Sequence, residues 1–217
     1  MLIYYYSTKL KYKPNVDLND LKKEIYKNKQ LHNNIYGIDD YIDSCFRVLR
    51  QTYIDEKDIY YNFANLENYY TEIKFKNSEL RIHFDISKAK QIAAKYNIQT
   101  IPLSAFSEYD DGSATIKYNP VMINKTHQLS TAPIITIPYR FSGLFYLTID
   151  GNHRITKLKE SNEYSVSAVL LALPDILTLI SSNFEKAVYL FLYEGADIPK
   201  YIHNSATQYY KNGVFIF

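Results

Sequence analysis

The sequence predicts an α+β protein in which a mixed sheet packs against helices. Three observations support this fold class. Apolar residues recur at helical spacing between residues 18 and 96 and again after residue 173. Short β-rich pieces separated by proline and glycine occupy residues 98–150, and a strand passes directly into a helix at Asp150-Gly151.

The first part of the chain predicts a strand, two helices and a hairpin. Residues 2–8 are rich in Ile and Tyr, which favour a strand, and a helix is expected over residues 18–30. A second helix is indicated by apolar side chains at spacings of three and four residues: Ile38, Tyr41, Ile42, Cys45, Phe46 and Leu49. Two alternating runs then meet at Asn77-Ser78, as the strands of a hairpin do.

A short helix from Ser87 leads into the β-rich part of the chain. There, "APIITIPYR" and "LFYLTID" predict two neighbouring strands, and a helix follows Asp150. The chain continues with an apolar element in "YSVSAVLLAL", two helices near residues 173–181 and 183–193, and a strand in "GVFIF".

The change in sequence pattern after residue 97 predicts two regions. Residues 1–97 form an N-terminal α/β region of helices and a hairpin, and residues 98–217 form a second region that includes the C-terminal helices. No flexible linker separates them in the sequence, so one continuous domain is the alternative.

The overall composition and charge do not indicate a particular binding partner. The chain of 217 residues has 25 Lys and Arg against 23 Asp and Glu, and its net charge of +2 gives weak support to a nucleic-acid ligand. The single cysteine, Cys45, cannot form an internal disulfide and is expected to be a buried thiol in a reducing compartment. Pro174 and Asp175 interrupt the apolar residues 165–182, so we expect no membrane span there. Because "MLIYYYSTKLKYKP" does not have the pattern of a secretory signal, we expect a cytoplasmic protein.

The junction in "FYLTIDGNHRITKLKE" carries the strongest functional signal. Asp150 is expected to cap the helix, and Gly151 to be its first residue. His153, Arg154 and Lys157 then fall in the first two turns, where the helix dipole disfavours each cation by about 0.3–1 kcal/mol. A sequence shaped by stability alone would prefer acidic residues at these positions.

Two interpretations of this basic cluster are open. A solvated basic patch needs no ligand. A bound anion, however, would offset the unfavourable dipole, because helix-terminal N–H groups, a glycine that permits close approach and a forked guanidinium together suit phosphate or carboxylate. We favour the anion site, with Gly151 admitting the ligand and Arg154 binding it.

The segment "YLTIDGNHRITKL" resembles the Asp-Gly-x-His-Arg box of the ParB/sulfiredoxin superfamily, in which a strand, this box and a helix form part of a phosphate- or nucleotide-binding site. The upstream "NPVMINKTHQLSTAPIITIPYR" is also similar to the Pro-containing element and strand that precede the box in that family. The resemblance covers residues 98–175 and implies a ParB/sulfiredoxin-like C-terminal half.

Departures from the family pattern narrow what the resemblance implies. Sulfiredoxin has a cysteine where this chain has Asn152, which argues against chemistry on sulfinic acid. Partition proteins carry Glu-Arg-Arg after the glycine and a second Glu-Asn-x-x-Arg box, of which "SSNFEK" is the closest equivalent and lacks the arginine. The sequence also has no DNA-reading helix-turn-helix segment. A simpler role in phosphate binding or phosphoryl transfer remains, as in the superfamily's free-serine kinases.

The resemblance implies a site with both catalytic and binding groups. In an enzyme for phosphoryl transfer or phosphodiester hydrolysis, Arg154 would stabilise the phosphoryl oxygens, His153 would act as a general acid and Asp150 would position a metal or nucleophile. The expected ligand-binding residues are Gly151, Asn152, Lys157, Arg140 and His127. The ligand would be a nucleotide or another phosphorylated small molecule. The metal is unknown and the cofactor is open, magnesium bound with a nucleotide being one option.

The rival hypothesis is a non-catalytic interaction protein of a mobile element or phage, in which the box is only a structural corner. Its contact surface for a protein partner would be the Tyr-rich segment "IYYNFANLENYY", residues 59–70. Exposed tyrosines provide both contact area and a polar tip at interfaces.

Overall fold

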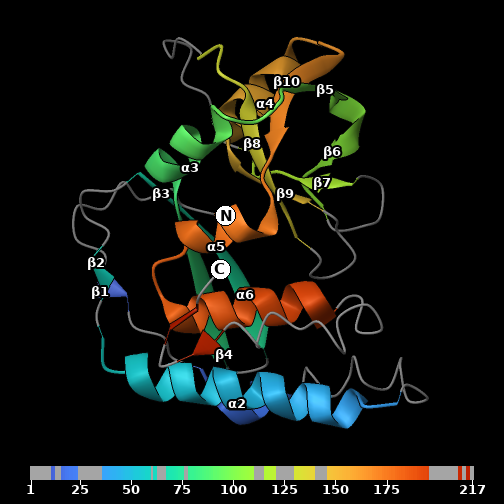
Figure 1. Cartoon of the computed structure of the whole chain (residues 1–217). Coiled ribbons are helices and arrows are strands. Elements are labelled where there is room, and N and C mark those ends of the chain that lie inside the picture. The colour runs from blue at the N-terminus through green and yellow to red at the C-terminus, as the bar shows by residue number, and fades with distance from the viewer. Residues whose placement is uncertain are drawn as a thin grey trace. The chain divides into compact units, whose positions relative to one another are not determined.

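The structure is a computed structural model, and it describes these residues of the chain: 11–12, 16–23, 36–59, 61–62, 67–75, 78–109, 115–120, 130–139, 146–195, 210–211 and 214–215. They confirm the α+β class, because helices accompany a mixed six-stranded sheet and separate two-stranded antiparallel sheets (Figure 1). The chain divides into two compact units. Unit 1 contains Met1–Asp85 and Ile180–Phe217, and unit 2 contains Ile86–Leu179.

Unit 2 is built on a six-stranded sheet. In spatial order its strands are β5 (Gln99–Pro102), β10 (Ser165–Leu170), β8 (Ile134–Pro138), β9 (Tyr146–Asp150), β7 (Ile116–Lys117) and β6 (Phe106–Ser107). β8 runs antiparallel to β9 and parallel to β10, while β7 is parallel to both β9 and β6. The two neighbouring strands predicted in "APIITIPYR" and "LFYLTID" are thus confirmed as β8 and β9.

Both faces of β8 are covered. Ile134, Ile135, Thr136 and Ile137 are all buried, and successive side chains of a strand point to opposite faces. Helix α4 (Asn152–Glu160) packs on the sheet through Ile155, which belongs to the same core cluster as Ile134. The helices α3 (Ile86–Ala93) and α5 (Leu173–Leu179) contact each other and β8, and the short helix η1 (Leu103–Ala105) contacts α4.

The apolar segment at residues 165–182 is the strand β10 followed by the helix α5, as predicted. Within the residues that the structure describes, no helix has both the length and the apolar character needed to cross a membrane.

Unit 1 combines a β-hairpin with two long helices. The predicted hairpin is confirmed as β3 (Asn68–Phe75) and β4 (Ser78–Asp85), and the helices are α2 (Ile38–Glu56) and α6 (Asn183–Gly195). α6 contacts both α2 and β4. Two short antiparallel pairs are also present: β1 (Lys11–Tyr12) with β2 (Tyr61–Asn62), and β11 (Tyr210–Lys211) with β12 (Val214–Phe215).

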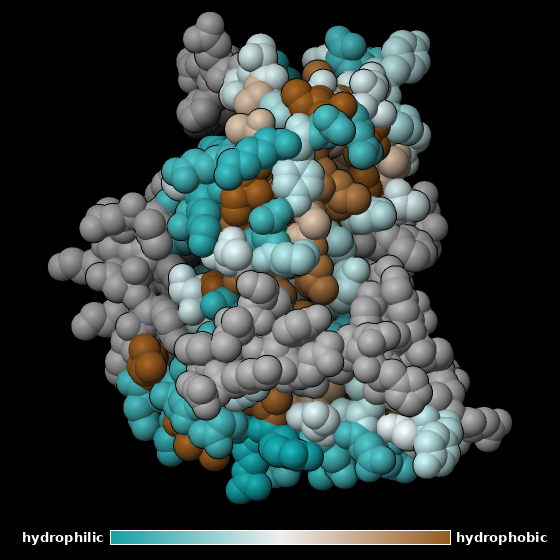
Figure 2. All heavy atoms as spheres, in the orientation of Figure 1, coloured by the Kyte–Doolittle hydropathy of each residue, from teal (hydrophilic) through white to brown (hydrophobic). Residues whose placement is uncertain are grey.

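Helix α2 is amphipathic, as its residue spacing predicts. Ile38, Ile42, Cys45 and Leu49 are buried, whereas Phe46 is only half-buried. Figure 2 shows the visible side of α2 as mostly hydrophilic. The buried thiol of Cys45, with 1% exposure, is confirmed.

The boundaries of the two units do not coincide with the position at which the sequence pattern changes. The contact division falls after Asp85 and returns residues 180–217 to unit 1, whereas the pattern changes after residue 97. The assignment of 1–97 and 98–217 to separate regions stays a prediction. Of the other expected elements, residues 18–23 are helical, and the strand at 2–8 lies outside the described residues.

Candidate functional site

The predicted switch from strand to helix is confirmed at the junction of β9 and α4. β9 ends at Asp150 and α4 begins at Asn152. The prediction that Asp150 is the N-cap residue was wrong, because Gly151 takes this position, with φ 95° and ψ 13°. This left-handed backbone conformation favours glycine and delays the start of the helix by one residue.

Gly151 also allows α4 to approach the sheet closely. A Cβ atom on this residue would lie 2.4 Å from Cγ2 of Ile134 on β8, well inside van der Waals contact. The space that the missing side chain leaves is therefore filled by Ile134. Packing and backbone conformation both require glycine here, and its expected role in admitting a ligand stays a prediction.

The Asn152 side chain ties the corner together. It is buried, its Oδ1 accepts a hydrogen bond from the backbone N–H of Asn119 at 2.9 Å, and its Nδ2 donates to the carbonyl of Thr148 at 3.4 Å. Both ends of the amide are thus engaged within the protein. The bond to Asn119 fixes the chain just after β7 beside the start of α4.

The guanidinium of Arg154 is half-buried at the same corner. Its Nη1 donates to the carbonyl of Ala132, just before β8, and its Nε is buried with no hydrogen-bond partner among the described residues. Burial lowers the pKa of Arg154, while the nearby Asp150 carboxylate raises it. The guanidinium stays charged, and a buried N–H without a partner costs about 1–3 kcal/mol.

The other basic residues of the cluster lie in different surroundings. His153 is exposed in the first turn of α4 and Lys157 is half-buried. Because α4 ends at Glu160, Lys157 and Lys159 fall in its last turn, where the dipole favours a cation. The prediction that Lys157 opposes the dipole was therefore wrong, and the argument applies to His153 and Arg154 alone.

The topology of the sheet brings three chain segments to this corner. The ends of β7 and β9 and the beginning of β8 meet there, since β7 is parallel and β8 antiparallel to β9. Asn152 and Arg154 bond to the segments beside β7 and β8. Arg140 and His127, the other two expected ligand-binding residues, lie outside the described residues.

No protein-family model, curated protein or solved structure matches this chain. The site is therefore interpreted from its own residues. Among the described residues, no group of three or more His, Cys, Asp or Glu side chains could hold a metal ion.

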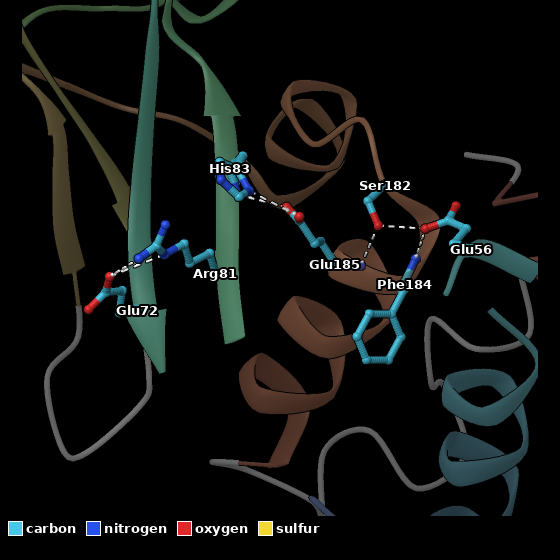
Figure 3. Close-up of polar contacts among 7 residues, drawn as sticks. All are labelled: Glu56, Glu72, Arg81, His83, Ser182, Phe184 and Glu185. Atoms are coloured by element: carbon cyan, nitrogen blue, oxygen red, sulfur yellow. Dashed lines mark hydrogen bonds and ion pairs between the residues drawn. The ribbon is translucent and has the colours of Figure 1, made fainter. Parts of the chain in front are cut away.

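A second polar cluster, in unit 1, was missed at the sequence level. Ser182 Oγ donates to Glu56 Oε2 at 2.5 Å and accepts from the backbone N–H of Glu185 at 3.0 Å. Glu185 in turn contacts His83 at two points (Figure 3). A signal for part of it exists, because Ser182 and Glu185 in "SSNFEK" have the Ser-x-x-Glu spacing of a helix capping box.

Proposed function

We propose that unit 2 binds a phosphate-bearing ligand, such as a nucleotide, at the corner between β9 and α4, with Arg154 as the principal cation. The observation that carries this proposal is the state of its guanidinium. The bond to Ala132 uses Nη1, and Nε is buried with no hydrogen-bond partner among the described residues. A guanidinium donates in a fixed planar geometry that matches two oxygens of a phosphate or carboxylate, so a bound anion would offer the acceptor that Nε lacks.

The place of Arg154 in the fold supports an anionic ligand. It lies in the first turn of α4, where the helix dipole favours a negative charge. The corner also lies beyond the carboxyl end of β9, the side of an α/β sheet on which ligands commonly bind. A cation at this end is unfavourable without an anion, so the ligand would offset a cost that the free protein carries.

The resemblance of residues 150–154 to the ParB/sulfiredoxin box supports the same ligand class. If the site is catalytic, Arg154 would stabilise charge on the phosphoryl group and the exposed His153 would serve as general acid. Asp150, which interacts electrostatically with Arg154, would position the nucleophile or a metal. Asn152 stands where sulfiredoxin has cysteine, so chemistry on sulfinic acid is not part of the proposal.

The second candidate is a non-catalytic interaction protein, and one observation favours it. Gly151 and Asn152 are both engaged in packing the corner, as expected if the box is structural. The proposed contact segment at 59–70 offers less support. Tyr69 is only 6% exposed in β3, and the Tyr70 ring packs against His83.

Binding measurements on Arg154→Ala test the proposal. The wild type is titrated with inorganic phosphate and a panel of nucleotides, with and without magnesium. Loss of a charged hydrogen-bonding partner should weaken binding by about 1.5–3 kcal/mol, a factor of roughly ten to a hundred and fifty. The melting temperature without ligand should stay equal or rise slightly, because removal of the unsatisfied N–H and of the repulsion with the helix dipole offsets the loss of the hydrogen bond to Ala132.

Arg50→Ala is the matched control, since Arg50 is exposed on α2 and its loss changes the net charge equally. It should bind the ligand as the wild type does. If the wild type binds no phosphorylated compound and Arg154→Ala melts several degrees lower, Arg154 is a structural residue and the interaction protein becomes the better proposal.

A further inference from the structure

Unit 1 contains a hydrogen-bonded cluster of buried ionisable groups that the proposed phosphate site does not use. We call it the clasp, and it consists of Glu56, His83, Ser182 and Glu185 (Figure 3). These side chains are between 1% and 7% exposed. They connect the last turn of α2, the start of α6 and the strand β4.

Glu56 forms one end of the clasp. Its carboxylate accepts from the backbone N–H of Asn183 at 2.8 Å, from that of Phe184 at 3.0 Å and from Ser182 Oγ. A carboxylate that only accepts hydrogen bonds has the pattern of the ionised form. Glu56 thus places a buried negative charge at the amino end of α6, where the helix dipole stabilises it.

Glu185 and His83 form the other end. Glu185 Oε2 accepts from the backbone N–H of His83 at 2.7 Å, and Oε1 lies 3.0 Å from Nδ1 of the same residue. If Glu185 is ionised and the imidazole neutral, the pair carries a buried negative charge close to that of Glu56. One further proton makes the pair neutral and keeps both contacts, because a protonated Oε1 can donate to Nδ1.

We infer that the Glu185–His83 pair is a pH-sensitive contact between α6 and β4. The contact is stable when the pair is neutral overall, and it weakens when the pair loses that proton on the alkaline side of neutrality. Two buried like charges are costly in a low-dielectric interior, and this drives proton uptake on folding. In agreement, burial raises the pKa of Glu185, contacts with His83 lower it and the Glu56 charge raises it further.

The other charged groups around the clasp have partners of their own. Arg81 on β4 pairs with Glu72 at 3.0 Å and lies over the Tyr70 ring. Lys186 on α6 contacts Asn183 Oδ1 at 3.5 Å, and burial together with the nearby Asp55 and Glu56 carboxylates raises the pKa of the Tyr210 hydroxyl above its usual value, so this group stays protonated through neutral pH. The pH response is therefore assigned to Glu185 and His83.

The direction of the response follows from linkage. A free carboxyl and a free imidazole have both released their acidic protons above about pH 7.5, so the unfolded pair carries one negative charge there. The folded pair retains a proton that the unfolded pair has lost. Its contribution to stability is complete at acidic pH and falls as pH rises, by up to about tenfold in the local folding equilibrium per pH unit.

Hydrogen exchange of the full chain between about pH 6.5 and 9, corrected for the intrinsic pH dependence of exchange, tests this inference. Protection of α6 amides should fall with rising pH in the wild type. Glu185→Gln, which mimics the protonated acid, should give a flatter profile and greater protection than the wild type at the alkaline end. Glu72→Gln, on the same hairpin but outside the clasp, should keep the wild-type profile, and α4 amides in unit 2 serve as an internal reference.

Parallel profiles for the wild type and Glu185→Gln, or lower protection of the variant at every pH, would overturn the inference. Should Glu185→Gln fail to fold, ¹⁵N spectra of the wild-type imidazoles replace it, with His83 assigned through His83→Gln. The Nδ1 signal of His83 should shift within the same pH interval. A signal that stays constant throughout would overturn the inference as well.

Discussion

At the scale of single residues, the backbone and a neighbouring side chain leave Gly151 little freedom. Its φ of 95° is left-handed, which disfavours any residue with a side chain. A Cβ atom there would also lie 2.4 Å from the Ile134 side chain. We expect Gly151→Ala to destabilise the protein by roughly 2–5 kcal/mol, the sum of the conformational cost and the cost of overpacking. Denaturant unfolding followed by circular dichroism measures the change.

The same position allows the two causes to be separated. Ile134→Ala removes the Cγ2 methyl group that a Cβ atom at residue 151 would meet at 2.4 Å and leaves only the Cβ contact at 2.9 Å, so Gly151→Ala should cost less in that background than in the wild type. A double-mutant cycle gives the coupling between the two sites. If the two changes are additive, steric contact with Ile134 does not explain the glycine.

At the scale of secondary-structure elements, α6 depends on a cap from another helix. Glu56→Ala removes the acceptor of two backbone N–H groups, that of Asn183, which is partly buried, and that of Phe184, which is buried. We expect a loss of roughly 2–4 kcal/mol, combining a lost cap with unsatisfied donors. Asp43→Ala, at an exposed position of the same α2, should change the free energy of unfolding by less than about 0.5 kcal/mol. Equal effects of the two variants would contradict a capping role for Glu56.

The elements themselves were largely predictable. Periodicity placed α2, the hairpin, β8, β9, α5 and α6, and the switch at Asp150 fell where the pattern changes. The exact ends of the helices were harder to predict from the sequence. Gly151 takes the N-cap position because of its left-handed backbone angle, which the composition does not reveal. α4 ends at Glu160 as predicted, at a turn where Asn162 adopts φ 55° and Glu163 N–H bonds to the Leu158 carbonyl, the pattern of a Schellman motif.

The candidate site was predictable in position and less so in detail. The charge pattern points to residues 150–154, but only the fold shows that Asn152 is used internally and that Arg154 reaches Ala132. The clasp could not be predicted, because its contacts join residues far apart in the sequence. His83 and Glu185 are 102 residues apart, and Glu56 and Ser182 are 126 residues apart. Contacts at such separations leave no local pattern in a single sequence.

At the scale of the whole molecule, the two units differ in how the chain builds them. Unit 2 is one continuous segment, whereas unit 1 needs two segments, because its β4 and α2 pack against α6. We expect a fragment of residues 86–179 to fold alone, with a cooperative thermal transition in circular dichroism. A fragment of residues 1–85 should lack one, because it contains Glu56 and His83 without α6. The reverse result would show that contact units do not correspond to folding units here.

This division of unit 1 has a consequence for synthesis on the ribosome. When β4 has emerged, Glu185, whose carboxylate accepts from the backbone N–H of His83, is not yet made. At typical translation rates, the residues of unit 2 take on the order of ten seconds to appear. Throughout that interval the nascent hairpin exposes an incomplete apolar face and an unpaired strand edge, which are the features that chaperones and aggregating partners recognise. The middle of the chain can therefore fold before the first part is complete, because α6, which packs on the earlier segment, is made only after unit 2.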